Sequence, residues 1–504
     1  MTARRRSGRQ RRHEVAAAPP AVNPAPPGQR GGRYKPLSEA ECQRIYRAAL
    51  DLLRDLGMGE VPDRLQQVLL KNGAHQIDKD RISIPEEMVE AARRVALSEF
   101  VFHGRDPKRS ITLGGDRVHF GTGGAAVQVL DIDDGLYRAA TLKDLHAFTR
   151  LQDALTNISW FTRCCIATDI EDIYDLDANT LYALLANTTR PVGTAFTIAE
   201  HVAPLVEMLD IAAGGPGQFA QRPWLKAHIS PVISPMRFGE DAVDVLFACV
   251  EHNIPVSLIT AAQAGATAPA TLAGFLAQSL AETLASLVMM QCIAPGHPMI
   301  FSNWPLVIDL RTGAFAGGGG EIAVLNAASA QMCNWLGLPG GVAASMTDAK
   351  AIDAQHGAEK AMTSLAAALA GGNLIYESSG MTASLLGASF EAFVLDDEMH
   401  GATYRALRGI EVNDATLDLA AMREAILGEG HYLGGQQTLE AMTRDYVYPS
   451  LANRDIPRVW AESGAPSAWD AARQKALDIL HSHRPTYLTA EQDAAIRARF
   501  NILA

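Results

Sequence analysis

The sequence lacks any stretch of about 18 uninterrupted apolar residues, the length that a helix needs to cross a bilayer. Its arginine-rich start is not followed by the apolar segment of a secretory signal. The six cysteines are scattered and none belongs to a C-x-x-C pair, which argues against a disulfide framework and a zinc knuckle. We therefore expect a cytoplasmic protein with reduced thiols and no membrane partner.

Common catalytic and nucleotide-binding signatures are also missing. The chain has no G-x-x-x-x-G-K-[ST], G-x-S-x-G or H-E-x-x-H pattern, so the usual phosphate-binding loop, serine hydrolase and zinc protease classes are not indicated. Residues 121–126 formally match G-x-G-x-x-A, but that fingerprint requires a helix at the glycines. A second β-like run, 127–131, follows at once. A glycine hairpin between residues 117–120 and 127–131 is the favoured interpretation.

Charge is unevenly distributed along the 504 residues. Residues 1–33 carry eight arginines against one glutamate, whereas the whole chain has a net charge of −12. With the proline- and alanine-rich run 17–27, this composition predicts a disordered basic arm over residues 1–33. Such arms can bind nucleic acid or an acidic partner. The favoured interpretation is a solvated tail without a catalytic role, and no nucleic-acid partner is expected.

The order of the predicted elements indicates the fold class. Residues 34–155 begin with a helix that Ser38 can cap and continue with short β runs, which predicts an N-terminal helical and β-hairpin segment. Strand-like and helical runs then alternate, which is typical of a parallel sheet covered on both faces. We predict an α/β fold with a (β/α)8 TIM-type barrel over residues 156–395, with an open doubly wound sheet as the alternative. The candidate strands are 158–167, 191–198, 225–232, 254–261, 298–302, 341–346 and 374–378.

The last part of the chain, residues 396–504, is mostly helical in pattern. It predicts a helical C-terminal extension packed on the barrel. Because large barrels with apolar helical extensions often associate, a homo-oligomer is expected.

The densest group of polar residues lies in the segment 347–360, directly after a candidate strand. In α/β proteins ligands bind where the parallel strands end, so this segment is the predicted centre of the active site. Asp353, His356 and Glu359 follow at i, i+3 and i+6, along one side of a helix, a spacing that also permits a metal site. The residues predicted to be catalytic are Asp348, Asp353 and His356, and Gln355 and Glu359 are predicted to contact substrate.

Four collinear segments resemble the trimethylamine methyltransferase family. They are 264–274 (AGATAPATLAG), 309–313 (DLRTG), 347–360, and 430–433 (GHYL) with Thr438, Leu439 and Trp460. The resemblance runs from about residue 33 to the C-terminus. It implies a (β/α)8 barrel that moves a methyl group from a methylated amine to the cob(I)alamin of a separate corrinoid protein. Archaeal members carry pyrrolysine and act on trimethylamine, whereas this chain has only ordinary residues. It therefore resembles the branch that demethylates quaternary amines such as glycine betaine.

The chemistry of the leaving group favours a quaternary substrate. A quaternary nitrogen leaves as a neutral tertiary amine, so no proton donor is required, and no metal ion bound by this chain is expected. The sequence has no D-x-H-x-x-G pattern, by which corrinoid carriers present a histidine to cobalt. The cobalamin is therefore expected on a partner protein. The glycine run 317–320 suits its close approach, with a flexible loop as the alternative.

Further substrate contacts are predicted from residue type. Aromatic faces hold quaternary ammonium groups, and nearby carboxylates add to the attraction. Arg311 suits a substrate carboxylate, although an ion pair with Asp309 or Glu321 is an equal alternative, and His356 or Gln355 could make the contact instead. His228 is interpreted as a core histidine. The predicted substrate-binding aromatic and acidic residues are Trp304, Phe315, Tyr376, Phe390 and Glu377.

Two other functions compete with the methyltransferase. One is a metal-dependent barrel lyase or hydrolase in which Asp348, Asp353, His356 and Glu359 are ligands or acid and base. The other is a non-catalytic relative that binds betaine-like compounds without transferring a methyl group.

Overall fold

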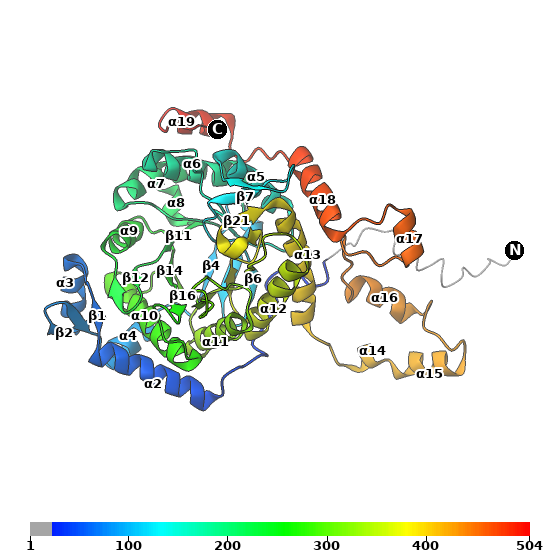
Figure 1. Ribbon diagram of the computed structural model, residues 1–504, viewed down its shortest axis with the longest axis horizontal. Helices are drawn as coiled ribbons and strands as arrows, with labels where there is room; N and C mark the ends of the chain where they lie inside the picture. The colour runs from blue at the N-terminus through cyan, green and yellow to red at the C-terminus, as the bar shows by residue number, and fades with distance from the viewer. Residues whose placement is uncertain (1–22, 504) are drawn as a thin grey trace.

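The computed structural model describes residues 23–503, and its centre is a parallel sheet curled into a barrel (Figure 1). A parallel bridge between Gly121 and Trp160 joins the two edge strands and closes the ring. The predicted α/β class and barrel architecture are thus confirmed. Around the ring the strands follow in the order β6 (His119–Phe120), β19 (Leu374–Tyr376), β18 (Gly340–Ala343), β16 (Met299–Asn303), β14 (Val256–Thr260), β11 (Leu225–Ile229), β10 (Val192–Thr194) and β9 (Phe161–Thr162).

The barrel strands are apolar on both faces because helices cover them outside and side chains fill them inside. In β14, Val256 and Leu258 belong to the outer core, while Ile259 joins the apolar cluster inside the barrel. Successive side chains of a strand point to opposite faces, so neighbouring residues belong in turn to the core outside the barrel and to the core inside it. The covering helices are α6 (Ile173–Asn187), α7 (Val202–Ala213), α9 (Glu240–Glu251), α10 (Leu272–Ile293), α11 (Gly320–Leu336), α12 (Ala354–Ala370) and α13 (Phe390–Arg408).

Helix α10 is long and apolar enough to cross a membrane by length and composition alone. However, 78% of its most apolar window is buried inside the protein. It packs on β14 and β16 on one side and on α2 (Glu39–Asp55) and α4 (Glu86–Val95) on the other. Its apolar character is therefore that of a helix buried between two layers.

The N-terminal segment forms a layer on one side of the barrel. Ser38 and Glu41 form the capping box that begins α2, as the sequence predicts for Ser38. The hairpin of β4 (Glu99–Phe102) and β5 (Ile111–Gly114) adds Phe102 and Leu113 to the apolar cluster inside the barrel. A five-stranded sheet completes the layer, in the order β12 (Val232–Ile233), β13 (Arg237–Phe238), β1 (Met58–Gly59), β3 (Arg81–Ser83) and β2 (His75–Asp78).

The barrel begins earlier in the chain than residue 156. Its first strand, β6, pairs with β19 and carries the glycine segment 121–124 at its end. The expected glycine hairpin is wrong, because β6 does not pair with β7 (Gln128–Leu130). Instead β7 lies in a separate sheet with β8 (Tyr137–Ala139), β21 (Gly387–Ser389) and β20 (Met381–Thr382). A strand of two residues shows no periodicity from which its partner could be predicted.

The two ends of the chain also differ from expectation. Most of the expected arm, residues 1–22, lies outside the described residues, but residues 23–33 are ordered against the barrel. Gly28 donates to Val118, Gly31 donates to Asp116 and Ala25 is fully buried. The prediction of disorder is therefore wrong for residues 23–33.

The C-terminal extension packs on the barrel only in part. Helix α18 (Ala468–Ser482) packs on α13, and α19 (Ala490–Arg497) packs on α7. The segment between α13 and α18 projects to one side of the barrel (Figure 1). Its helices contain no buried residue, so the expected packing of the whole extension is wrong for them. They are α14 (Asp414–Leu417), α15 (Leu419–Leu427), α16 (Gln436–Arg444) and α17 (Pro457–Glu462).

Candidate active site

Four rings meet inside the barrel, and we call them the aromatic cluster: Trp160, His228, Trp304 and Tyr376. The ring of Tyr376 is central, with centroids 4.6 Å from Trp160, 4.7 Å from Trp304 and 5.8 Å from His228. Trp160 and Tyr376 are fully buried, whereas Trp304 is 7% exposed and His228 is half-buried. The cluster therefore meets solvent through His228 and Trp304, on the side where the strands end.

Hydrogen bonds fix the orientation of Tyr376. Its hydroxyl lies 2.8 Å from Ser257 Oγ, which lies 2.9 Å from Ser302 Oγ. Burial raises the pKa of Tyr376, so its hydroxyl stays protonated at neutral pH. Trp304 differs, because its Nε1 has no hydrogen-bond partner among residues 23–503. The faces of the two rings, one of them anchored, are suited to binding a small cation.

A lysine lies beneath the rings. Lys226 of β11 is fully buried, and its Nζ lies 4.7 Å from the ring centroid of Tyr376 and 5.3 Å from that of Trp160. Burial lowers the pKa of Lys226 to about 7. Lys226 is not among the residues predicted from the sequence, although a lysine in the otherwise strand-like run LKAHI is the signal that marks it.

A buried carboxyl group lies at the ends of β19 and β6. Glu377 follows Tyr376, and a Cβ added to Gly123 or Gly124 would lie 2.7 Å from one of its carboxylate oxygens. Burial raises the pKa of Glu377 to about 8, although the charge of Lys360 acts in the opposite direction. Neither carboxylate oxygen has a hydrogen-bond partner within the described part of the chain. A cation that binds nearby would favour the ionised form and gain a charge partner.

The glycine segment 121–124 makes room for these side chains. A Cβ at Gly121 would lie 2.1 Å from the ring of Trp160, and Gly123 and Gly124 leave space for Glu377. From the sequence, the same glycines were predicted to form a hairpin. Trp160 was missed as well, although it falls within the candidate strand 158–167.

The carboxylates of the segment 347–360 bind their own backbone. Asp348 accepts hydrogen bonds from the amides of Gly317 and Gly318 at 2.8 and 3.3 Å. Glu359 accepts from the Asp348 amide at 2.8 Å and from the Thr347 hydroxyl at 2.6 Å. These bonds hold the glycine run 317–320 against the end of β18. Gly317 and Gly318 therefore belong to a loop whose position is fixed.

The side chains of Asp353, Gln355 and His356 do not converge on one point either. Asp353 is exposed and is the N-cap of α12, where it accepts from the amides of Gln355 and His356. Exposed Gln355 donates to Glu359. His356 is buried, and burial together with the charge of Lys360 lowers its pKa to about 3. Among residues 23–503 no three His, Cys, Asp or Glu side chains come together in a way that would hold a metal ion.

The remaining predicted residues divide between the site and the rest of the molecule. Arg311 is 87% exposed and forms an ion pair with Asp309 at 2.7 Å, the alternative that the sequence left open. Phe390 stacks on Phe148 at 4.0 Å in the outer core and cannot contact a ligand inside the barrel. Phe315 is half-buried against the inner apolar cluster, to which Trp304 and Tyr376 belong.

Asp353 is the N-cap residue of helix α12, so its expected role is structural. Replacing it by alanine is expected to lower the free energy of unfolding by about 1 kcal/mol, the usual effect of losing an N-cap side chain. Turnover per folded molecule should be unchanged, because the carboxylate serves only the first turn of α12. Urea unfolding and a turnover assay on the same preparation measure both quantities. A tenfold loss of turnover would place Asp353 in the active site after all.

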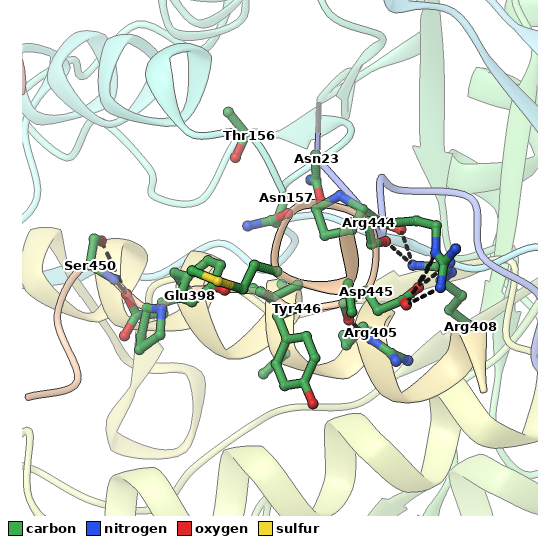
Figure 2. A pocket seen from close by; sticks show the side chains of 18 of the residues that line it. Asn23, Thr156, Asn157, Glu398, Arg405, Arg408, Arg444, Asp445, Tyr446 and Ser450 are labelled. Carbon is green, nitrogen blue, oxygen red and sulfur yellow. Dashed lines mark hydrogen bonds and ion pairs between the residues drawn. The ribbon is translucent and has the colours of Figure 1, made fainter. Parts of the chain in front are cut away.

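A large cleft lies elsewhere in the described part of the chain. It has a volume of about 1510 Å³ and separates the second half of α13 from the projecting extension (Figure 2). Thr156 and Asn157, on its wall, precede β9, so the cleft is at the opposite end of the barrel. Its charged groups pair with one another, as Asp445 does with Arg408 at 2.9 Å and with Arg444 at 2.8 Å. The cleft is therefore the boundary between helix α13 and the projecting extension.

A closed parallel barrel with ionisable and aromatic side chains at its strand ends defines the class of (β/α)8 barrel enzymes. The comparisons with known proteins narrow the class, because the family model described as trimethylamine methyltransferase matches residues 4–501. The chain belongs to the trimethylamine methyltransferase family and is a methyltransferase. The resemblance predicted from the sequence is confirmed.

Two curated relatives cover nearly the whole chain. A glycine betaine methyltransferase of Desulfitobacterium hafniense (strain Y51) is 28% identical, over 94% of this chain and 97% of that protein. A trimethylamine methyltransferase of Methanosarcina barkeri is 30% identical, over 90% and 91%. Among solved structures, a dihydropteroate synthase from Xanthomonas albilineans matches with 14% identity and a TM-score of 0.35, over 60% of this chain and 97% of that one.

Proposed function

We propose that this methyltransferase removes a methyl group from a quaternary amine, such as glycine betaine, and passes it to cob(I)alamin on a separate corrinoid protein. The observation that carries the proposal is the aromatic cluster at the strand ends, with the buried carboxyl of Glu377 close behind Tyr376. Aromatic faces and a carboxyl group that ionises beside a cation are the two features that recognise a trimethylammonium group.

The residues of the site suit a reaction that needs no proton donor. The carbon–nitrogen bond breaks with its electron pair going to nitrogen, which leaves as a neutral tertiary amine. His228 and Tyr376 are both neutral in this environment, because burial lowers the pKa of the first and raises that of the second. Their work is then to position the methyl group and to exclude water. The reduced corrinoid supplies the methyl acceptor.

An acceptor from outside fits the exposed side of the site. His228 and Trp304 are the members of the aromatic cluster that reach solvent, so the reacting methyl group has to face that side. A Cβ added to Gly320, nearby in the loop that Asp348 holds, would meet no atom within 4 Å. This glycine leaves the loop without a side chain that would obstruct an approaching partner.

The metal-dependent alternative has less support. The carboxylates of Asp348, Asp353 and Glu359 accept hydrogen bonds from backbone amides of their own chain. Ligands of one ion need free oxygens that converge, and these are directed to three different pieces of backbone.

An assay with a reduced corrinoid carrier tests the proposal directly. Glycine betaine, choline, carnitine and trimethylamine are offered separately, and formation of methylcobalamin is followed by absorbance. We expect transfer from at least one quaternary amine and none from trimethylamine. Binding of a quaternary amine without transfer would indicate the non-catalytic relative, and efficient use of trimethylamine alone would contradict the proposal.

We also propose that the enzyme is a homo-oligomer held together by the projecting extension. Between residues 410 and 460, fourteen large apolar side chains are more than a third exposed. Exposed apolar surface on this scale marks an interaction site. The five most exposed of them are Ile410, Val412, Leu419, Ile426 and Leu427.

The stability of short helices indicates which partner covers them. Helices α14 to α17 have at most nine residues each, and isolated helices of this length are marginal in water. To stay folded, these helices need a partner surface that remains in contact with them. A corrinoid carrier has to leave after each methyl transfer, whereas a second copy of the chain stays. The occupant is therefore another subunit.

Light scattering after size exclusion tests the interface. The wild-type chain is expected to elute as a dimer or larger assembly, and Ile426→Glu with Leu427→Glu is expected to dissociate it, because buried carboxylates without partners are costly. Leu136→Glu is the matched control, since Leu136 is equally exposed but lies outside the extension. A monomeric wild-type protein would contradict the proposal.

A further inference from the structure

The lysine beneath the aromatic cluster has no partner. Lys226 is fully buried, and its Nζ makes no hydrogen bond or ion pair within residues 23–503. Buried lysines are nearly always paired, since an ammonium that has lost its water needs an anion or several acceptors in return. The ring faces of Tyr376 and Trp160 compensate only partly.

A second unpaired group lies close to this ammonium. Both approach Gly193 of β10, where an added Cβ would lie 3.1 Å from Lys226 Nζ and 2.6 Å from Thr162 Oγ1. The Thr162 hydroxyl also has no partner among the described residues. An ammonium and a hydroxyl, both unpaired, thus lie beside the same glycine, and both can donate hydrogen bonds to one anion.

Two positive charges act on His228, which lies on the same strand as Lys226. The guanidinium of Arg163, directly after β9, and the ammonium of Lys226 together help to lower the pKa of His228. A second cation placed here without an anion would meet repulsion from both groups, and low-dielectric surroundings strengthen that repulsion. A ligand that brings its own anion would instead be attracted.

We infer that Lys226 binds the carboxylate of the substrate and thereby makes the enzyme specific for zwitterionic betaines over quaternary amines that carry no anion. This inference rests on the proposed function. It narrows the substrate class from quaternary amines in general to compounds in which trimethylammonium and carboxylate belong to one small molecule.

The order of residues along β11 agrees with the direction of the reaction. Lys226 precedes His228 by two positions on a strand that runs towards the open end, which separates them by roughly 6.6 Å. A carboxylate at Lys226 therefore lies deep in the barrel. The trimethylammonium of the same molecule lies nearer to His228, Trp304 and Tyr376, and its methyl groups face the side that meets solvent.

Binding measured without any corrinoid tests the inference on the unaltered enzyme. Calorimetry compares glycine betaine with two probes of similar size that lack the carboxylate charge, its methyl ester and choline. We expect glycine betaine to bind at least about 100-fold more tightly than either, because a buried ammonium left unpaired costs several kcal/mol. Equal affinities for the three compounds would overturn the inference while leaving the proposed function intact.

A variant locates the effect at Lys226. In Lys226→Met the side chain stays similar in length but loses its charge, so the protein is expected to be at least as heat-stable as the wild type. Its affinity for glycine betaine should fall about 100-fold, whereas its affinity for choline should stay the same or rise. Arg311→Met, an exposed cation outside the barrel, is the control and should change neither affinity.

The outcomes separate the two claims. If Lys226→Met keeps its affinity for glycine betaine, or loses betaine and choline to the same extent, Lys226 does not read the carboxylate. If the wild-type enzyme binds no quaternary amine at all, the proposed function fails and this inference fails with it. Because the comparison of glycine betaine with its ester uses the wild-type protein, it decides the question even if the variant does not fold.

Discussion

Replacing Trp304 by alanine is expected to lower kcat/KM for methyl transfer from a quaternary amine about 100-fold. A cation over an aromatic ring gains about 0.5 to 2 kcal/mol, and displaced substrate loses further rate because methyl transfer needs an in-line geometry. Trp304 forms the outer wall of the aromatic cluster beside Tyr376, where the reacting methyl group has to be held. Steady-state kinetics with a saturating corrinoid carrier measures the effect.

Two variants serve as controls for Trp304. Trp304→Phe keeps a ring face and should retain most of the activity. Phe390→Ala removes a ring of the outer core that stacks on Phe148, so it should destabilise the fold by about 3 to 5 kcal/mol without changing turnover per folded molecule. If Trp304→Ala retains full kcat/KM, the aromatic cluster does not hold the substrate.

Replacing Lys360 by methionine is expected to lower the free energy of unfolding by about 3 to 5 kcal/mol, the usual result of breaking a buried ion pair on one side. Lys360 Nζ lies 3.0 Å from an Asp396 oxygen, and both side chains are almost fully buried. Asp396 also accepts a hydrogen bond from the Gly380 amide at 2.7 Å. Without the lysine, its carboxylate remains in the core with too few donors. Urea unfolding at pH 7 measures the change.

A second substitution and a change of pH test that explanation. Lys360→Met combined with Asp396→Asn removes both charges and should recover most of the lost stability. Burial raises the pKa of Asp396 to about 6, above its value in the unfolded chain, and loss of Lys360 raises it further. The deficit of the single variant should therefore shrink as the pH falls towards 5, where Asp396 is protonated. A deficit that is independent of pH and persists in the double variant would point to packing instead.

The alternation of strand and helix was sufficient to predict most of the barrel. Each of the seven candidate strands overlaps one of the barrel strands, β9, β10, β11, β14, β16, β18 and β19. The eighth, β6, has two residues and belongs to the barrel only through its pairing with β19, which is formed 254 or more positions away in the chain. No local pattern contains that information.

The site was predicted only in part. Trp304, Tyr376 and Glu377 were predicted as substrate contacts because aromatic and acidic residues directly at strand ends can be recognised in sequence, and the structure places Trp304 beside Tyr376. The polar segment 347–360 was predicted to be the centre of the active site, but Asp348 and Glu359 accept hydrogen bonds from backbone amides. In a sequence, such carboxylates cannot be distinguished from carboxylates that bind a ligand. Lys226 was overlooked because its surroundings in the sequence are those of any buried strand.

The sequence by itself determined the family, the barrel and the approximate edge at which the site lies, since these follow from motifs and from periodic burial along the chain. Only the tertiary structure decided which side chains share a space: it brings Trp160, Lys226, Trp304 and Tyr376 together from four strands and directs Asp348 and Glu359 to the backbone. The physical reason is that hydrogen bonding and charge depend on distances of a few ångströms, and the closure of the barrel sets those distances between residues that are far apart in the chain.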